Sequence, residues 1–132
     1  MTMMFRLFIP ICALNKTDMY EDRIQRAVDN FKQGYNCAQA VTAAFADLYS
    51  LTEEQALRIS ASFGGGIGRM REVCGAASGM FILAGLQTGT IDPKDSKGKE
   101  YNYQVVQQLA AEFRKRNGSI ICGELLGLRK PA

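Results

Sequence analysis

One stretch in mid-chain decides the fold: Ser62-Phe63-Gly64-Gly65-Gly66-Ile67-Gly68-Arg69-Met70-Arg71-Glu72-Val73-Cys74-Gly75-Ala76-Ala77-Ser78-Gly79. It holds six glycines around one cysteine, Cys74, and Arg69 and Arg71 come shortly before that cysteine. Glycine permits positive φ and close backbone approach, although it loses much conformational freedom on folding. The cluster therefore has two interpretations. It serves tight helix packing around a sharp connection, or it brings backbone N–H groups and an arginine to a reactive Cys74.

The composition is that of a small globular protein. The chain has 132 residues, of which 47% are hydrophobic and 22% charged, a length and balance typical of one domain with its own core. A net charge of +3 is too small to indicate a nucleic-acid partner. There is no histidine, which removes the commonest general base and metal ligand. Four cysteines without a CxxC pair do not form a disulfide scaffold, so we expect a cytoplasmic protein with reduced thiols.

Apolar residues recur at helical spacing along the whole domain, and no stretch alternates as a strand does. We predict an all-α, compact single-domain bundle of five or six short helices, with a glycine-rich loop before a central apolar helix. The first three predicted helices run from a cap at Thr17 or Asp18 to Gly34, from the cap Asn36 to Leu48, and from the capping box of Thr52 and Gln55 to Phe63. The next two run from about Glu72 to Thr88 and from about Glu100 to Arg116, and Ser119 is expected to cap a short last helix that carries Cys122. Residues 89–98 are expected to form a loop. Among the apolar positions expected to be buried are Phe31, Leu48, Ile59, Tyr101, Leu125 and Leu126.

The two ends of the chain differ from its middle. Residues 1–18 read as an N-terminal extension that contains Cys12 and an apolar run, residues 7–14, too short to span a bilayer. Residues 19–128 are expected to form the helical domain and residues 129–132 a C-terminal tail. No membrane span is predicted. The apolar helix near residues 72–88 is central in a monomer, and a homodimer that buries it is equally allowed.

Three cysteines share one position in the predicted structure. Cys37 follows a cap, Cys74 follows the glycine run, and Cys122 follows Ser119 by three residues. Each thus lies near a helix N-terminus, where unpaired N–H groups and the helix dipole favour a thiolate. The alternative is that they are small hydrophobic residues of the core.

The same residues resemble a known family. Gly34-Tyr35-Asn36-Cys37-Ala38-Gln39-Ala40-Val41, Phe63-Gly64-Gly65-Gly66-Ile67-Gly68, Cys74-Gly75-Ala76-Ala77-Ser78-Gly79 and Gly118-Ser119-Ile120-Ile121-Cys122-Gly123-Glu124-Leu125-Leu126-Gly127 are similar, in this order, to the motifs of the putative redox-active protein family named for its C_GCAxxG_C_C cysteine pattern. Members are small helical proteins whose activity is not established. The resemblance implies a redox or metal role for Cys37, Cys74 and Cys122. In the family a fourth cysteine follows the last glycine motif; no cysteine follows Gly127 in this sequence, so we expect that one copy does not complete a four-thiolate site.

Three hypotheses follow. In a thiol redox protein, Cys74 is the low-pKa reactive thiolate and Cys37 or Cys122 resolves it, with an unidentified redox partner. In a metal or iron–sulfur protein, the same three thiolates are ligands and one position stays open. In a helical interaction module without chemistry, the cysteines only fill the core. Because these hypotheses differ in whether any reaction takes place, the sequence leaves open whether the chain is an enzyme. A loop site for an anionic group would use Gly64, Gly65, Gly66, Gly68 and Arg69.

Overall fold

The computed structural model describes residues 17–130, and this part of the chain is all-α, as predicted. Its helices are α2 (Thr17–Gln33), α3 (Cys37–Phe45), α4 (Glu53–Ser60), α5 (Gly64–Ile67), α6 (Gly75–Thr88), α7 (Ser96–Asn117) and α8 (Cys122–Leu125), with short 3-10 helices η2 (Ala46–Tyr49) and η3 (Ala61–Phe63). The extended backbone in this range includes one isolated antiparallel bridge, between Val73 and Ile121. The predictions for residues 1–16 and 131–132 lie outside the described residues.

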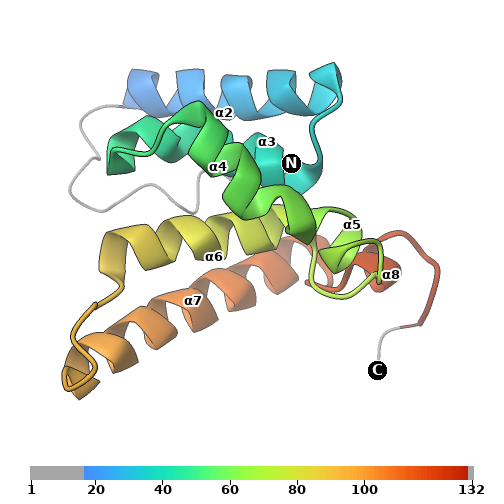
Figure 1. Cartoon of the computed structure of the whole chain (residues 1–132). Coiled ribbons are helices and arrows are strands. Elements are labelled where there is room, and N and C mark those ends of the chain that lie inside the picture. The colour runs from blue at the N-terminus through green and yellow to red at the C-terminus, as the bar shows by residue number, and fades with distance from the viewer. Residues whose placement is uncertain (1–16, 131–132) are drawn as a thin grey trace.

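Helix α6 occupies the middle of the bundle (Figure 1). It packs against α3 on one side and α7 on the other, while α2 and α4 both pack against α3. Met80, Leu83 and Ala84 of α6 are buried in the main core cluster together with Phe45 and Phe113. The prediction of a central apolar helix is therefore confirmed. Within the described residues, no helix is long and apolar enough to cross a membrane.

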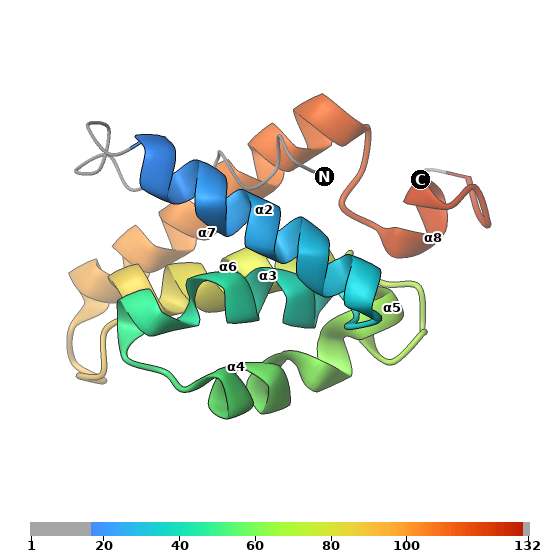
Figure 2. The same ribbon diagram turned by 90° about the horizontal axis from the view of Figure 1, so that it is seen from above.

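Helices α3 and α6 run in the same direction, and both begin at the end of the bundle where α5 and α8 lie (Figures 1 and 2). The start of α3 is fixed by a capping box, because Asn36 Oδ1 accepts from Gln39 N at 2.9 Å and Gln39 Oε1 accepts from Asn36 N at 3.2 Å. A second capping box, of Thr52 and Gln55, starts α4 as predicted. This common end of the bundle carries Cys37, Cys74 and Cys122.

Three predicted helix starts are wrong by a few residues. Helix α6 begins at Gly75, not Glu72, because residues 72–74 are drawn into the bridge with the segment around Ile121. Helix α7 begins at Ser96, not Glu100, because Asp95 Oδ1 accepts from Gly98 N at 2.8 Å and caps it. Helix α8 begins at Cys122, so Ser119 is not its cap.

Several residues expected in the core are exposed. Ile59 and Tyr101 keep 47% and 59% of their surface in contact with solvent. The full set of such residues is Phe31, Leu48, Ile59, Tyr101, Leu125 and Leu126. The apolar period of these helices continues beyond the part of each helix that a neighbouring element covers, and the sequence pattern alone does not show where that cover ends.

Candidate functional site

The first cysteine, Cys37, is the first residue of α3 and is packed against the start of α6. An ideal Cβ on Gly75 would overlap Cys37 Sγ, and it would lie 3.0 Å from Phe63 O and 3.1 Å from Ala38 N. Real Cβ atoms essentially never come as close to another atom as this one would come to the sulfur, and the other two contacts would be unusually tight. The sulfur of Cys37 therefore occupies the space that a side chain at position 75 would need. Gly75 directly follows Cys74 in the chain.

The glycine loop, residues 64–71, is a left-handed turn. Residues 65 to 69 all have φ between 58° and 72°, and Arg71 has φ 63°. Three of these positions are occupied by Ile67, Arg69 and Arg71, although the conformation costs an L residue roughly 1–2 kcal/mol. Gly68 N donates to Ser62 O at 2.8 Å and Glu72 N donates to Gly66 O at 2.9 Å, and these bonds close the turn.

The loop leads into an extended segment that holds two cysteines beside each other. Cys74 N donates to Ile120 O at 2.7 Å, and Cys122 N donates to Glu72 O at 2.6 Å. These bonds flank the Val73–Ile121 bridge, and the backbone of Cys74 and of Ile121 is extended. In this antiparallel register Cys74 lies opposite Ile120, so Cys74 and Cys122 are diagonal neighbours on the same face.

Cys122 is enclosed by the loop. An ideal Cβ on Gly66, which is buried and has φ 72°, would lie 2.6 Å from Cys122 Cβ and 2.7 Å from Arg71 Cα. Arg71 Nη1 donates to Cys122 Sγ at 3.7 Å. Only glycine at position 66 lets the turn lie this close to Cys122, and the turn in turn aims Arg71 at the sulfur.

The position of Cys74 at a helix start predicts a lowered pKa, but the pKa of Cys74 is raised. Burial is the main cause, and negative charge on Cys37 and Cys122 adds to it. The N–H groups of Ala77 and Ala76 act in the opposite direction, although they close no side-chain capping bond to Cys74. The helix-terminus effect is thus present but weaker than desolvation. Cys37 and Cys122 are thus near enough to Cys74 to contribute to the rise of its pKa.

The loop residues predicted to bind an anionic group lie in and before the left-handed turn. Gly64 packs against the side chain of Asn36, Gly65 lies beside the stem of Arg69, and Arg69 itself is exposed. The arginine that contacts a cysteine is Arg71, and the cysteine is Cys122 rather than Cys74. All residues that the sequence singled out nevertheless belong to one end of the bundle.

A preformed metal site does not fit this arrangement. Among residues 17–130, no three Cys, Asp or Glu side chains form a group that could hold a metal ion. The three cysteines are free thiols at one end of the bundle, and among the described residues they do not form a ligand set. We therefore derive no chemistry through a metal or an iron–sulfur cluster.

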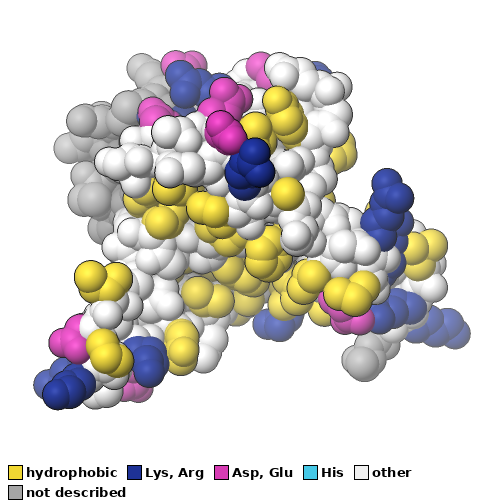
Figure 3. All heavy atoms as spheres, viewed as in Figure 1, with side chains coloured by type: hydrophobic (Ala, Val, Ile, Leu, Met, Phe, Trp, Pro, Cys, Tyr) yellow, Lys and Arg dark blue, Asp and Glu magenta, His cyan; other side chains and the backbone are white. Residues whose placement is uncertain are grey.

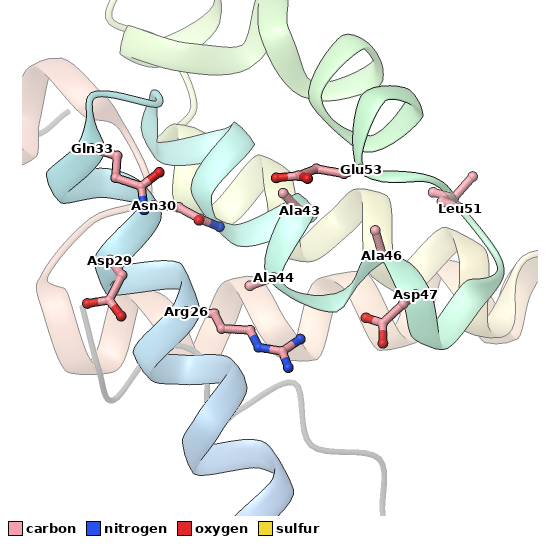
Figure 4. A pocket seen from close by; sticks show the side chains of 10 residues that line it. All are labelled: Arg26, Asp29, Asn30, Gln33, Ala43, Ala44, Ala46, Asp47, Leu51 and Glu53. Atoms are coloured by element: carbon pink, nitrogen blue, oxygen red, sulfur yellow. The ribbon is translucent and has the colours of Figure 1, made fainter.

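A separate hollow lies between α2 and the segment from α3 to the start of α4 (Figure 4). It has a volume of about 520 Å³, and Arg26, Asp29, Asp47 and Glu53 are among the residues that line it. Arg26 extends toward Asp47, and its charge helps to lower the pKa of Asp47, although the hydrogen bond from Arg23 is the main cause of that lowering. No cysteine lines this hollow. Its charged side chains are exposed, which is typical of a solvated surface.

Sequence reasoning missed one residue of the site, Arg129. Its Nη2 donates to Arg71 O at 2.8 Å and to Glu72 Oε2 at 3.2 Å, so it ties the chain after α8 to the glycine loop. Gly123 N also donates to Arg71 O, at 3.0 Å. Nothing in the sequence near residue 129 indicates a partner more than fifty positions earlier, because only the tertiary fold brings them together.

A family model matches most of the chain. The model of a family described as Putative redox-active protein (C_GCAxxG_C_C) matches residues 35–132, which include all three cysteines and the glycine loop. No curated protein and no solved structure matches the chain.

Proposed function

This chain belongs to the family described as Putative redox-active protein (C_GCAxxG_C_C), and we propose that it performs thiol–disulfide exchange with Cys122, Cys74 and Cys37. The observation that carries the proposal is geometric: two backbone hydrogen bonds hold Cys74 and Cys122 on adjacent segments, and Cys37 Sγ packs against Gly75 at the same end of the bundle. A strained loop next to them supports it, because residues in costly backbone conformations cluster at functional sites.

Cys122 is proposed as the attacking thiol. The attacking species in disulfide exchange is a thiolate, and a neighbouring cation favours it. Arg71 Nη1 lies 3.7 Å from Cys122 Sγ, whereas Cys74 is disfavoured as a thiolate by its burial. The Cys122 thiolate attacks one sulfur of a substrate disulfide. A new S–S bond forms to that sulfur, and the other substrate sulfur leaves as a thiolate that takes up a proton.

Cys74 is proposed as the resolving thiol. Once deprotonated, it attacks Cys122 Sγ, so that the Cys74–Cys122 disulfide forms and the second substrate sulfur leaves as a thiol. The substrate disulfide is then reduced to two thiols, and the protein dithiol is oxidised. Diagonal neighbours in an antiparallel pair lie about 7–8 Å apart at Cα. A disulfide spans roughly 4.4–6.8 Å, so the short segments around Cys74 and Cys122 must close by about 1 Å.

Cys37 is the second thiol that influences Cys74, and its sulfur lies against Gly75, the next residue in the chain. It therefore competes with Cys122 for Cys74. A Cys37–Cys74 disulfide would tie α3 to α6, whereas a Cys74–Cys122 disulfide would tie α8 to α6. The two products are distinguished by which single substitution abolishes the internal disulfide.

The test is the reaction of the reduced protein with 5,5′-dithiobis(2-nitrobenzoate), in a Cys12→Ser background so that only the three site thiols react. With one equivalent of the reagent, we expect two equivalents of thionitrobenzoate to be released and the protein mass to fall by two hydrogens, because the two protons leave with the formation of one internal disulfide. Cys122→Ser is expected to slow the first release about tenfold or more. Cys74→Ser is expected to trap a mixed disulfide on Cys122, and Cys37→Ser to leave the internal disulfide intact.

Two results would overturn the proposal. One is that no variant forms an internal disulfide and the three thiols react at one common rate, which favours the interaction module. The other is that Arg71→Gln leaves the rate at Cys122 unchanged while Cys74→Ser still gives the internal disulfide. Arg58→Gln, at an exposed arginine of α4, is the matched control for loss of a positive charge.

A further inference from the structure

Charge is unevenly distributed along the fold. Residues 64–74 and 114–130 together carry seven Lys or Arg and two Glu, a formal net charge of +5. The other described residues, 17–63 and 75–113, carry seven Lys or Arg and eleven Asp or Glu, a formal net charge of −4. The modest charge of the whole chain therefore hides two parts of opposite sign.

The two positive segments meet at one end of the molecule. The glycine loop, α5 and α8 lie together in both ribbon views, and the chain leads from the end of α7 into α8 (Figures 1 and 2); dark blue side chains gather over this end in Figure 3. We call this end, formed by residues 64–74 and 114–130, the basic end. It is also the end that carries Cys74 and Cys122.

The acidic groups of the basic end are already engaged. Glu72 pairs with Arg129 at 3.2 Å, and Glu124 Oε1 accepts from Ser119 Oγ at 3.0 Å. Arg69 and Lys130 are exposed on the same end. The outward field of this surface is therefore positive around the thiols.

Exposed apolar side chains lie between these charges. Met70 keeps 63% of its surface exposed, Leu126 58% and Leu128 65%. Met70 belongs to the glycine loop, and Leu126 and Leu128 follow α8, which packs against α5. Leu126 N donates to Cys122 O at 2.9 Å, so these apolar residues are anchored directly to the cysteine segment. Apolar side chains in a charged rim are typical of a protein-docking surface.

We infer that the basic end docks an acidic segment of a partner protein whose disulfide or thiol exchanges with Cys122. The inference rests on the proposed function and adds the class of partner. Charge complementarity raises the rate of encounter and rejects partners of like sign. Exposed Met70, Leu126 and Leu128 add short-range contact area that a small anion would not use.

The test uses two synthetic peptides that differ only in charge. Each carries one cysteine as a mixed disulfide with thionitrobenzoate, flanked by apolar residues and by Glu in one peptide or Lys in the other. At low salt we expect the acidic peptide to react at least about tenfold faster than the basic one, and the ratio to fall below about threefold in 0.5 M NaCl. The neutral reagent 4,4′-dithiodipyridine measures the intrinsic reactivity of the thiols.

Matched charge reversals locate the surface. Arg69→Glu with Lys130→Glu is expected to slow the acidic peptide about fivefold or more relative to the neutral reagent measured on the same variant. Lys97→Glu with Lys99→Glu makes the same change in net charge at the other end of α7, and we expect less than about a twofold effect.

The outcomes separate the two proposals. Equal rates with both peptides, together with normal reaction of the neutral reagent, would overturn the docking inference and leave thiol exchange standing. Failure to form an internal disulfide with the neutral reagent would overturn the proposed function itself. Binding to phosphatidylserine vesicles that is lost in Arg69→Glu with Lys130→Glu, without discrimination between the peptides, would assign the surface to a membrane and overturn the inference.

Discussion

Replacement of Gly75 by alanine tests how closely α3 and α6 approach at the site. The added methyl group would overlap Cys37 Sγ and would lie 3.0 Å from Phe63 O and 3.1 Å from Ala38 N. Ordinary contacts of carbon are about 3.5–4.0 Å. The sulfur must therefore move aside, and the two backbone atoms must retreat by roughly 0.5 Å.

The expected net cost follows from two opposing terms. Overpacking of a well-packed contact costs about 1–3 kcal/mol. Alanine in place of glycine in a helix returns about 0.5–1 kcal/mol. We therefore expect Gly75→Ala to lower the free energy of unfolding by about 1–2 kcal/mol.

Gly85 provides the matched control in the same helix. It is exposed, its φ is not positive, and an added Cβ there would meet nothing within 4 Å. Gly85→Ala should stabilise the protein by about 0.5–1 kcal/mol. The two variants should therefore differ by about 2–3 kcal/mol in urea unfolding followed by circular dichroism, or by roughly 8–12 °C in Tm.

Cys37→Ala shows how much of the destabilisation by Gly75→Ala comes from the contact with the sulfur. Because it removes the sulfur, Cys37→Ala combined with Gly75→Ala should recover about 0.5–1 kcal/mol relative to the sum of the single effects. A Gly75→Ala protein as stable as Gly85→Ala, or a double variant that recovers nothing, would refute the close approach of Cys37 Sγ to α6.

Three further predictions concern single positions. Thr42 is fully buried and its Oγ1 has no hydrogen-bond partner, so Thr42→Val should raise the free energy of urea unfolding by about 1 kcal/mol, and a loss would show that the hydroxyl is satisfied. Arg69 is exposed with φ 63°, so Arg69→Gly should stabilise by about 1 kcal/mol, whereas Arg58→Gly within α4 should destabilise by a similar amount; equal effects would contradict the left-handed turn. The raised pKa of Cys74 means that the folded protein holds the thiol proton more tightly than the unfolded chain, so the stability this contributes is present below the ordinary pKa of 9.0 and is lost as pH rises through the folded value. Unfolding of the parent protein and of Cys74→Ala, compared between pH 7 and 11, should show a stability difference that shrinks above about pH 9, and a constant difference would count against burial as the cause.

Local signals in the sequence predicted the parts of the site that are built locally. The cap at Asn36, the capping box of Thr52 and the central apolar helix each depend on residues within one or two turns of each other, and all three are confirmed. The glycine cluster also predicted close packing beside Cys74, and Gly75 does pack against Cys37. Its geometry could not be predicted, because a left-handed turn that includes Ile67 and Arg69 is held by bonds to the rest of the loop rather than by residue preference.

Long-range pairing accounts for what sequence reasoning could not supply. The bridge between Val73 and Ile121 shortens α6 and sets Cys74 beside Cys122, yet neither segment is long enough to show strand periodicity. Burial is the second such property. A helix start favours a thiolate, but the desolvation of Cys74 depends on which residues cover it in the fold. This desolvation raises the pKa of Cys74 by more than the N–H groups of Ala77 and Ala76 lower it.

The relation between glycines and cysteines favours the proposed thiol site over a core in which the cysteines only fill space. Gly75 leaves space for the sulfur of Cys37, and Gly66 lets a strained turn lie against Cys122. Cysteines that only fill a core need no left-handed turn, since an ordinary connection with larger side chains would bury the same area without that cost. The turn instead positions Arg71 against Cys122 Sγ and leaves the preceding residue, Met70, exposed to solvent. The strain of the turn is therefore coupled to the position of Arg71 at Cys122 Sγ. The variants of the two arginines separate these effects. Substitution of Arg71 should alter the reactivity of Cys122, whereas substitution of Arg69 should alter the stability of the loop and the electrostatic field around it.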